Sequence, residues 1–184
     1  MTMLVVLGMS VVVLLVMLAA VYNRLVKLRV RTDSAWADID VQLKRRHDLI
    51  PNLVSVVKGY ATHESSTFEN VTRLRAQAME ATGTAQRAVA EGQLTAALRG
   101  LFAVAEGYPQ LRASDNFLSL QHSLSEVEDA LQNARRYYNA VVRDLNTAVQ
   151  SFPTNLVAGL FSFASRAFFE VATTAERQPA DVKF

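Results

Sequence analysis

Histidines and acidic side chains are the residues of this sequence that could carry out chemistry. His63 and Glu64 begin like the zinc-binding motif of a metalloprotease, in which a second histidine stands four residues after the first. Thr67 occupies that position here, and a zinc site needs at least three protein ligands. His122 precedes Glu126 by four residues, which is the spacing of a surface ion pair on a helix. Neither histidine therefore predicts a metal site.

The acidic residues do not form an evident acid–base pair. Asp38 and Asp40 are two residues apart, so on a helix they face different directions. A hydrolase site built from Asp40, His47, Asp48 and Glu64 is a remote alternative, because it requires separate helical turns to converge. The sequence also has no phosphate loop, dinucleotide fingerprint or nucleophile elbow. We therefore expect no enzyme, no catalytic residue and no cofactor.

Arg46 is the polar residue whose position in the sequence most clearly requires a partner. It belongs to the charged run 44–48, which wraps around a helix and is mostly solvated. Its own position, however, falls on a hydrophobic seam, and a buried arginine needs a carboxylate or carbonyl partner. Glu128 and Asp129 on a later helix are the candidate partners. We predict that Arg46 makes a structural polar contact, and a contact with a ligand is the alternative.

Composition excludes several classes of protein. Nineteen basic and 17 acidic side chains leave a net charge of +2, without the concentrated basic face of a nucleic-acid-binding protein. The absence of cysteine excludes disulfides, thiolate metal sites and a thiol nucleophile. With only 7 glycines and 4 prolines in 184 residues, the chain is poor in turn formers and should consist mostly of long helices.

The N-terminal segment is apolar and predicts a membrane anchor. No charged side chain precedes Arg24, and a helix of about 20 residues spans the roughly 30 Å of bilayer hydrocarbon. A cleaved signal peptide is the alternative, but no basic residue precedes the apolar run and Leu18 is too large for a cleavage site. We therefore predict a retained anchor over 1–23. The predicted anchor residues are Met3, Leu4, Val5, Val6, Leu7, Val11, Val12, Val13, Leu14, Leu15, Val16, Leu18 and Tyr22.

The charges after this segment predict its orientation. Arg24, Lys27, Arg29 and Arg31 follow the apolar run, and no acidic residue occurs before Asp33. Basic residues next to a span remain on the cytoplasmic side. We therefore predict a single-pass protein of the bacterial inner membrane, with its N-terminus outside and its helical domain in the cytoplasm. A periplasmic domain is the topology alternative.

Hydrophobic residues recur every seven positions in two blocks, which is typical of packed helices. The first block lies between 36 and 60, and the second lies on a helix expected over about 114–150. Pro51 lies inside the first block and predicts a kink near 48–52. The predicted bundle seam comprises Trp36, Ile39, Leu43, Ile50, Leu53, Val57, Tyr60, Phe117, Leu120, Leu124, Val127, Leu131, Tyr138, Val141, Leu145 and Phe152.

These patterns predict an all-α fold in which an N-terminal transmembrane helix precedes an elongated antiparallel bundle of long helices. The anchor covers 1–23, the bundle 24–170 and a flexible C-terminal tail 171–184. Glycines at 83 and 92 bracket an expected break, and Gly107 begins a firm stop. Aromatic side chains near the end of the bundle either cap it or form a membrane-interface or protein-contact patch. They are Phe161, Phe163, Phe168 and Phe169.

Several blocks of the sequence resemble the LemA family of bacterial membrane-anchored helical proteins. The longest block is AWADIDVQLKRRHDLIPNLV at 35–54, and it is close to the family's signature. Further similar blocks follow in the family's order at 57–61, 63–64, 103–109, 116–121, 134–146 and 152–158. The polar positions within the matched motifs are Asp40, Arg46, Asp48, Asn52, Arg135 and Asn139.

The resemblance implies an anchor followed by an antiparallel helical bundle and no agreed biochemical activity. Family members are associated with membrane organisation and with membrane proteins that act in quality control. Many relatives carry a lipid-attachment cysteine after the apolar segment, and this chain has none. We therefore expect a non-catalytic scaffold on the lipid bilayer that forms a homo-oligomer or binds an unidentified membrane-protein partner, and no nucleic acid. A signalling or adaptor rod with two helical packings is the alternative.

Overall fold

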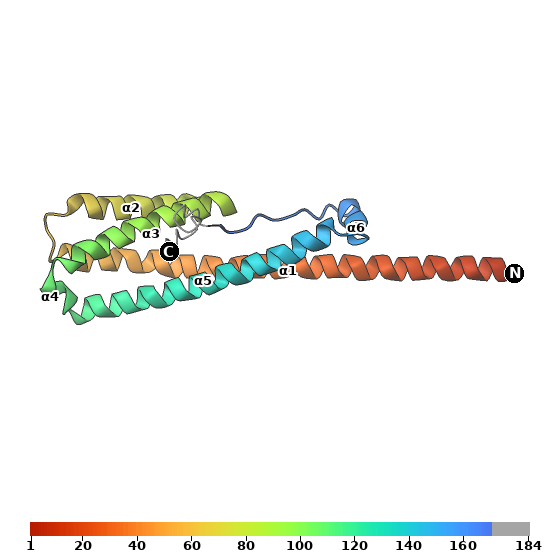
Figure 1. The fold of residues 1–184 in the computed structure, drawn as a ribbon, viewed down its shortest axis with the longest axis horizontal. Helices are drawn as coiled ribbons and strands as arrows, with labels where there is room; N and C mark the ends of the chain where they lie inside the picture. The colour runs from red at the N-terminus through yellow and green to blue at the C-terminus, as the bar shows by residue number, and fades with distance from the viewer. Residues whose placement is uncertain (171–184) are drawn as a thin grey trace, which may run out of the picture. The chain divides into compact units, whose positions relative to one another are not determined.

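The computed structural model describes residues 1–170 and confirms an all-α fold. Those residues contain no strand. Their helices are α1 (Thr2–Lys58), α2 (Ser65–Glu80), α3 (Thr84–Glu106), α4 (Pro109–Arg112), α5 (Asp115–Gln150) and α6 (Thr154–Leu160) (Figure 1). The tail predicted over 171–184 lies outside the described residues.

Helix α1 continues from the apolar N-terminal segment to Lys58 without a break. The boundary expected at residue 23 therefore falls inside one helix. Pro51 also lies within the helix, which continues for seven further residues after it. The helix ends where Gly59 and Tyr60 form a turn.

Two compact units can be distinguished by their internal contacts. The first comprises residues 1–38 and 134–167, and the second comprises 39–133 together with 168–170. Each unit has a hydrophobic core of its own.

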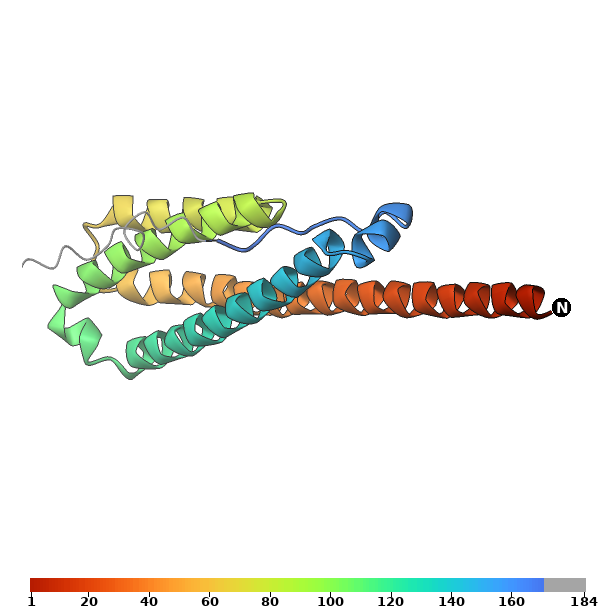
Figure 2. The ribbon, with the colours of Figure 1, turned by 45° about the vertical axis from the view of Figure 1, so that its right-hand side comes forward.

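The second unit is built around the helical pair α2 and α3. Gly83 allows the chain to reverse between them, because its φ of 79° lies in a region that side chains with a Cβ rarely adopt. The two helices consequently lie side by side in opposite directions (Figures 1 and 2). Gly92, expected to mark a break, lies inside α3. The core of this unit contains Ile50, Leu53, Val57, Val71, Leu94, Leu98, Leu101, Phe117 and Leu124.

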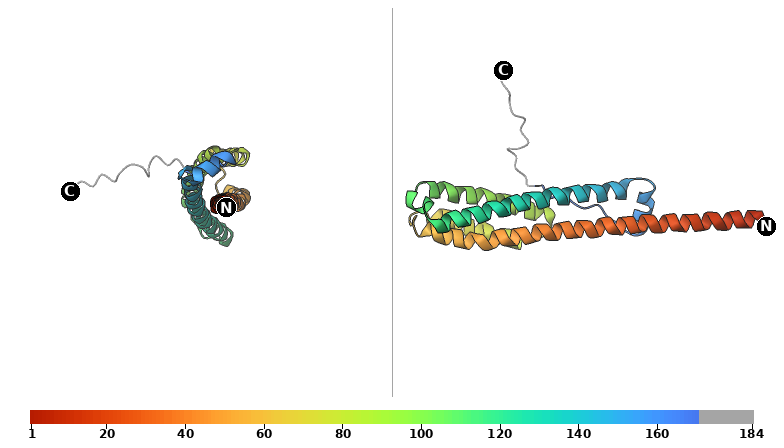
Figure 3. Two further views of the ribbon diagram at one scale, coloured as in Figure 1. Left: turned by 90° about the vertical axis from the view of Figure 1, so that its right-hand side faces the viewer. Right: turned by 90° about the horizontal axis from the view of Figure 1, so that it is seen from below.

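The core of the first unit joins three segments that are far apart in the sequence. Leu25 of α1 is fully buried, and Ala148 of α5 and Val157 of α6 pack in the same cluster. Trp36 and Tyr138 meet edge to face with ring centroids 5.3 Å apart. Helix α6 therefore lies against α1 and the end of α5 (Figure 3).

Most predicted seam residues are buried, and Trp36 and Leu120 are half-buried. Tyr60 and Phe152 depart from the prediction, because their side chains are 44% and 80% exposed. Both residues follow the end of a helix, α1 at Lys58 and α5 at Gln150. A seven-residue spacing places side chains on one face only while the helix lasts, so the seam ends with each helix.

Candidate functional site

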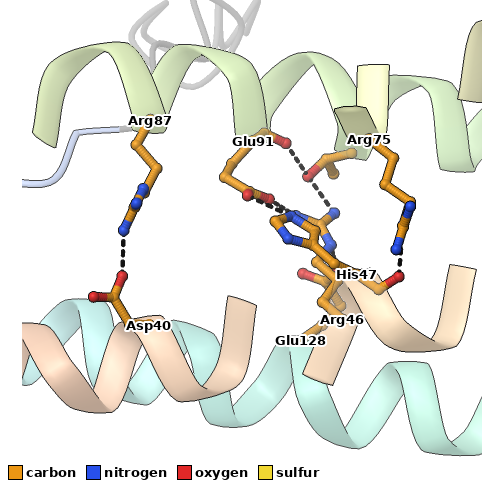
Figure 4. A network of polar contacts seen from close by, with 8 residues as sticks. Asp40, Arg46, His47, Arg75, Arg87, Glu91 and Glu128 are labelled. Carbon is orange, nitrogen blue, oxygen red and sulfur yellow. Dashed lines mark hydrogen bonds and ion pairs between the residues drawn. The ribbon is translucent and has the colours of Figure 1, made fainter. Parts of the chain in front are cut away.

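A buried polar network joins α1, α3 and α5 within the second unit (Figure 4). Arg46 and Glu91 are at its centre, and neither side chain is exposed to solvent. Arg46 Nη1 donates a hydrogen bond of 2.8 Å to Glu91 Oε2. Two opposite charges removed from water in this way depend on each other, because either one alone would be buried without compensation.

The rest of the Arg46 guanidinium is also engaged. Nη2 donates to Thr95 Oγ1 at 2.7 Å, and Nε lies 2.7 Å from Glu128 Oε1. Glu128 is one of the two carboxylates that the sequence suggested, whereas Asp129 is exposed. Two helices, α3 and α5, thus supply groups to a single arginine of α1.

Both carboxylate oxygens of Glu91 have a partner within the network. Its second oxygen, Oε1, lies 2.8 Å from Nε2 of His47, which is also buried. Thr95 completes the network by donating its hydroxyl hydrogen to the backbone oxygen of Glu91 at 2.9 Å. Each Glu91 carboxylate oxygen thus faces a side chain of α1 in the buried interior of the unit. The arrangement joins α1 and α3 through buried polar contacts.

Sequence reasoning missed Glu91. Its position could have indicated burial. Glu91 lies three residues before Leu94 and seven before Leu98, on the apolar stripe of α3. An acidic residue at such a position must pair with a basic one, and Arg46 was the basic residue with the matching demand.

The other acidic candidates each have a different partner. Asp40 forms an ion pair with Arg87 of α3. Asp48 pairs with Lys44 on the exposed surface at 2.8 Å, and the hydrogen bond from Lys44 lowers the pKa of Asp48. Glu64 precedes α2. The structure therefore does not assemble the remote hydrolase site from these residues and His47.

Two histidines remain outside the network. His63 is exposed before α2, and His122 lies 3.7 Å from Glu126 on the surface of α5. Within residues 1–170 no group of three or more His, Cys, Asp or Glu side chains could hold a metal ion.

Pro51 explains a further contact between helices. Proline has no N–H, so the carbonyl four residues earlier, that of His47, lacks its usual helical donor. Arg75 of α2 supplies one, because its Nε donates to the His47 backbone oxygen at 2.7 Å (Figure 4). The proline therefore exposes an acceptor through which α2 is held against α1.

We predict that Arg75→Met destabilises the protein by about 1–2 kcal/mol, because it leaves a partly buried carbonyl without a donor. In a Pro51→Ala background the same substitution should cost less than half as much, since the alanine N–H can bond His47. Urea unfolding of the four variants measures this coupling. Equal costs of Arg75→Met in both backgrounds would show that the contact does not depend on the proline.

The remaining family-motif residues are Asn52, Arg135 and Asn139. Asn52 is exposed on α1, and Arg135 and Asn139 are half-buried in the first unit. Nearby, the Tyr138 hydroxyl donates to the backbone oxygen of Ala167 at 3.0 Å.

The apolar segment of α1 is the second candidate functional feature. It is the one helix within residues 1–170 that is long and apolar enough to cross a membrane, and its most apolar stretch is not buried by other parts of the protein. Leu18 and Tyr22 at its end are contacted by the C-terminal part of the first unit. The basic side chains of Arg24, Lys27 and Arg29 follow, all exposed.

Comparison with known proteins adds a family assignment. The family model described as the LemA family matches residues 35–184. Magnetosome proteins MamQ 1 and MamQ 2 of Paramagnetospirillum magneticum are each 27% identical over 188 residues, which cover 88% of this chain and 69% of theirs. Protein LemA of Metamycoplasma hominis is 26% identical, over 86% of this chain and 73% of its own.

Proposed function

This chain belongs to the LemA family, and from that premise we propose that it is a membrane-anchored helical scaffold. The observation that carries the proposal is the continuity of α1. One helix contains both an apolar stretch long enough to span a bilayer and Arg46, the centre of the buried network. A connection by continuous helix, in place of a flexible linker, suits a scaffold that holds a helical domain at a membrane surface.

The polar network supports a structural role. Its charged groups are held by groups from other helices, so they fix the mutual register of α1, α3 and α5 within the second unit. Buried ion pairs serve best where a specific arrangement must be selected, and a scaffold depends on such an arrangement.

The proposed orientation places the helical domain on the cytoplasmic side of the inner membrane. Arg24, Lys27 and Arg29 directly follow the apolar segment and are exposed, as the positive-inside rule requires of a cytoplasmic flank. A periplasmic domain is the alternative.

The proposal includes assembly with further copies or with a membrane-protein partner. Several large apolar side chains of the second unit remain exposed: Val41, Met79, Val89 and Leu118. Anchoring in a membrane raises the local concentration of the domains, so interfaces of modest size suffice for assembly.

Chemical crosslinking in native membranes tests assembly. We expect crosslinked species larger than the monomer, formed at low crosslinker dose and lost when the membranes are dissolved and diluted in detergent. Val89→Gln replaces an exposed apolar side chain by a polar one, and so tests whether the exposed apolar surface takes part in assembly. Asn52→Gln, at an exposed polar position, is the control. Only monomer at every dose would contradict assembly.

A further inference from the structure

We propose, on the basis of the membrane anchor proposed above, that α6 and the turn after it lie in the lipid headgroup region of the bilayer. The partner of this surface is the membrane itself, at the point where α1 leaves the hydrocarbon. Four observations on the first unit carry the inference: the place of α6 on α1, its two apolar faces, the absence of charged residues from its own stretch of sequence, and the direction of the chain after it.

The place of α6 is fixed by contacts with the end of the apolar segment. Leu18, which belongs to that segment, packs in the cluster that contains Leu25 and Val157. The ring of Tyr22 meets that of Phe161 edge to face, with centroids 4.8 Å apart. If α1 spans the bilayer, these contacts hold α6 level with the last turn of the span, where aromatic side chains favour the interface (Figure 3).

Helix α6 is apolar on two faces. Val157 and Ala158 face the core of the unit and are buried. Leu156 and Leu160, one helical turn apart, face away and are 64% and 70% exposed. A helix that is apolar on both faces requires cover on both, and the described residues cover only one of them. Phe152, before the helix, is 80% exposed and extends the same apolar surface.

The charge pattern matches a lipid surface. No Asp, Glu, Lys or Arg occurs between Asp144 and Arg166, so no charge would be carried into the interface. Basic side chains stand beside this stretch on α1, and the Arg29 guanidinium lies 5.8 Å from the centre of the Phe163 ring. Apolar side chains directed at the acyl boundary, with arginines at the headgroups, are typical of interfacial segments.

The chain after α6 runs away from the proposed span, and charged residues occur again along this part of it. Arg166 bonds Asp33, with Nη2 and Oδ1 3.1 Å apart. Its backbone N–H and carbonyl also bond the Asn146 side-chain amide at 2.8 and 2.9 Å. At 1.5 Å per residue, Asp33 lies about 16 Å further along α1 than Tyr22. The first charged residue after α6 is therefore held well outside the proposed membrane boundary.

The cysteine-free sequence permits a direct test by single labels. Full-length Leu160→Cys, Val30→Cys and Val12→Cys carry an environment-sensitive fluorophore in phosphatidylcholine–phosphatidylglycerol vesicles, with few protein copies per vesicle. Val30 is the matched control, because it is 56% exposed on α1 but lies about 12 Å beyond Tyr22. Nitroxide lipids that quench at shallow or deep positions then report the depth of each label.

We expect shallow nitroxides to quench the Leu160→Cys label severalfold more than the Val30→Cys label, and deep nitroxides to quench Val12→Cys most strongly. Strong quenching at Val12→Cys with equal, weak quenching at Leu160→Cys and Val30→Cys would overturn the interfacial position and leave the anchor intact. Self-quenching of Leu160→Cys labels without lipid quenching would assign the surface to a second copy and also overturn it. Weak quenching at all three positions would remove the anchor and the inference together.

Discussion

Replacing Glu91 by glutamine is expected to destabilise the protein by about 3 kcal/mol, because the substitution leaves the buried Arg46 charge without its principal partner. Glu128, with its side chain 36% exposed, remains beside Arg46 and keeps the loss at the lower end of the range for a broken buried pair. For a chain of this size, that loss lowers the unfolding temperature by about 10 °C. Thermal unfolding of the full-length protein in detergent, followed by circular dichroism, measures it.

Two further variants separate the pair from a general effect of substitution. The double variant Arg46→Met with Glu91→Leu removes both charges and should be more stable than either single variant, since apolar residues of similar volume can replace a buried ion pair. Asp48→Asn is the exposed control, and losing its pairing with Lys44 should leave the unfolding temperature close to that of the parent protein. If Glu91→Gln unfolds at the temperature of Asp48→Asn, the network does not stabilise the bundle.

Replacing both Val12 and Leu15 by aspartate is expected to release most of the protein from the membrane. An acidic residue near the centre of a span costs about 2.5–3.5 kcal/mol on insertion, so two of them offset most of the favourable transfer of this segment. Both side chains are exposed, at 59% and 58%, so the substitutions do not disturb a protein core. Alkaline extraction of membranes followed by immunoblotting measures the retained fraction, which should fall severalfold.

Val30→Asp is the matched control for this experiment. Val30 is exposed on the same helix but lies beyond the apolar segment, so an acid there should leave the protein in the membrane fraction. Full retention of the Val12→Asp, Leu15→Asp variant would contradict anchoring by α1. If the Val30→Asp control also leaves the membrane fraction, release of the protein does not depend on placing the acid within the apolar segment.

The long helices could be predicted from the sequence because their signals are local. The helix expected over about 114–150 occurs as α5 (Asp115–Gln150), with Asp115 in its first turn, where the positive end of the helix dipole favours an acid. The stop expected at Gly107 is where α3 ends. The break between helices was expected to extend to Gly92, but Gly92 lies within α3, so that extent was wrong. Packing of α3 against α2 outweighs the weak helix propensity of a single glycine.

The polar network could be predicted only in part. The seven-residue repeat placed Arg46 on the seam and required a carboxylate partner, but Glu128 was one of two candidates and Glu91 was not among them. A repeat shows which face of a helix is buried, whereas the partner depends on which helix that face meets. Arg75 illustrates the same limit, since its acceptor is a backbone oxygen freed by Pro51 on another helix.

Composition and periodicity were sufficient to predict the apolar segment and the all-α fold, and the order of the matched sequence blocks was sufficient to predict the family. Packing of the helices was needed to show that Glu91 contacts both Arg46 and His47, and that α6 packs beside Leu18 and Tyr22. Such contacts join residues distant in the chain, and their selection depends on shape, burial and charge matching that act only once the helices are packed.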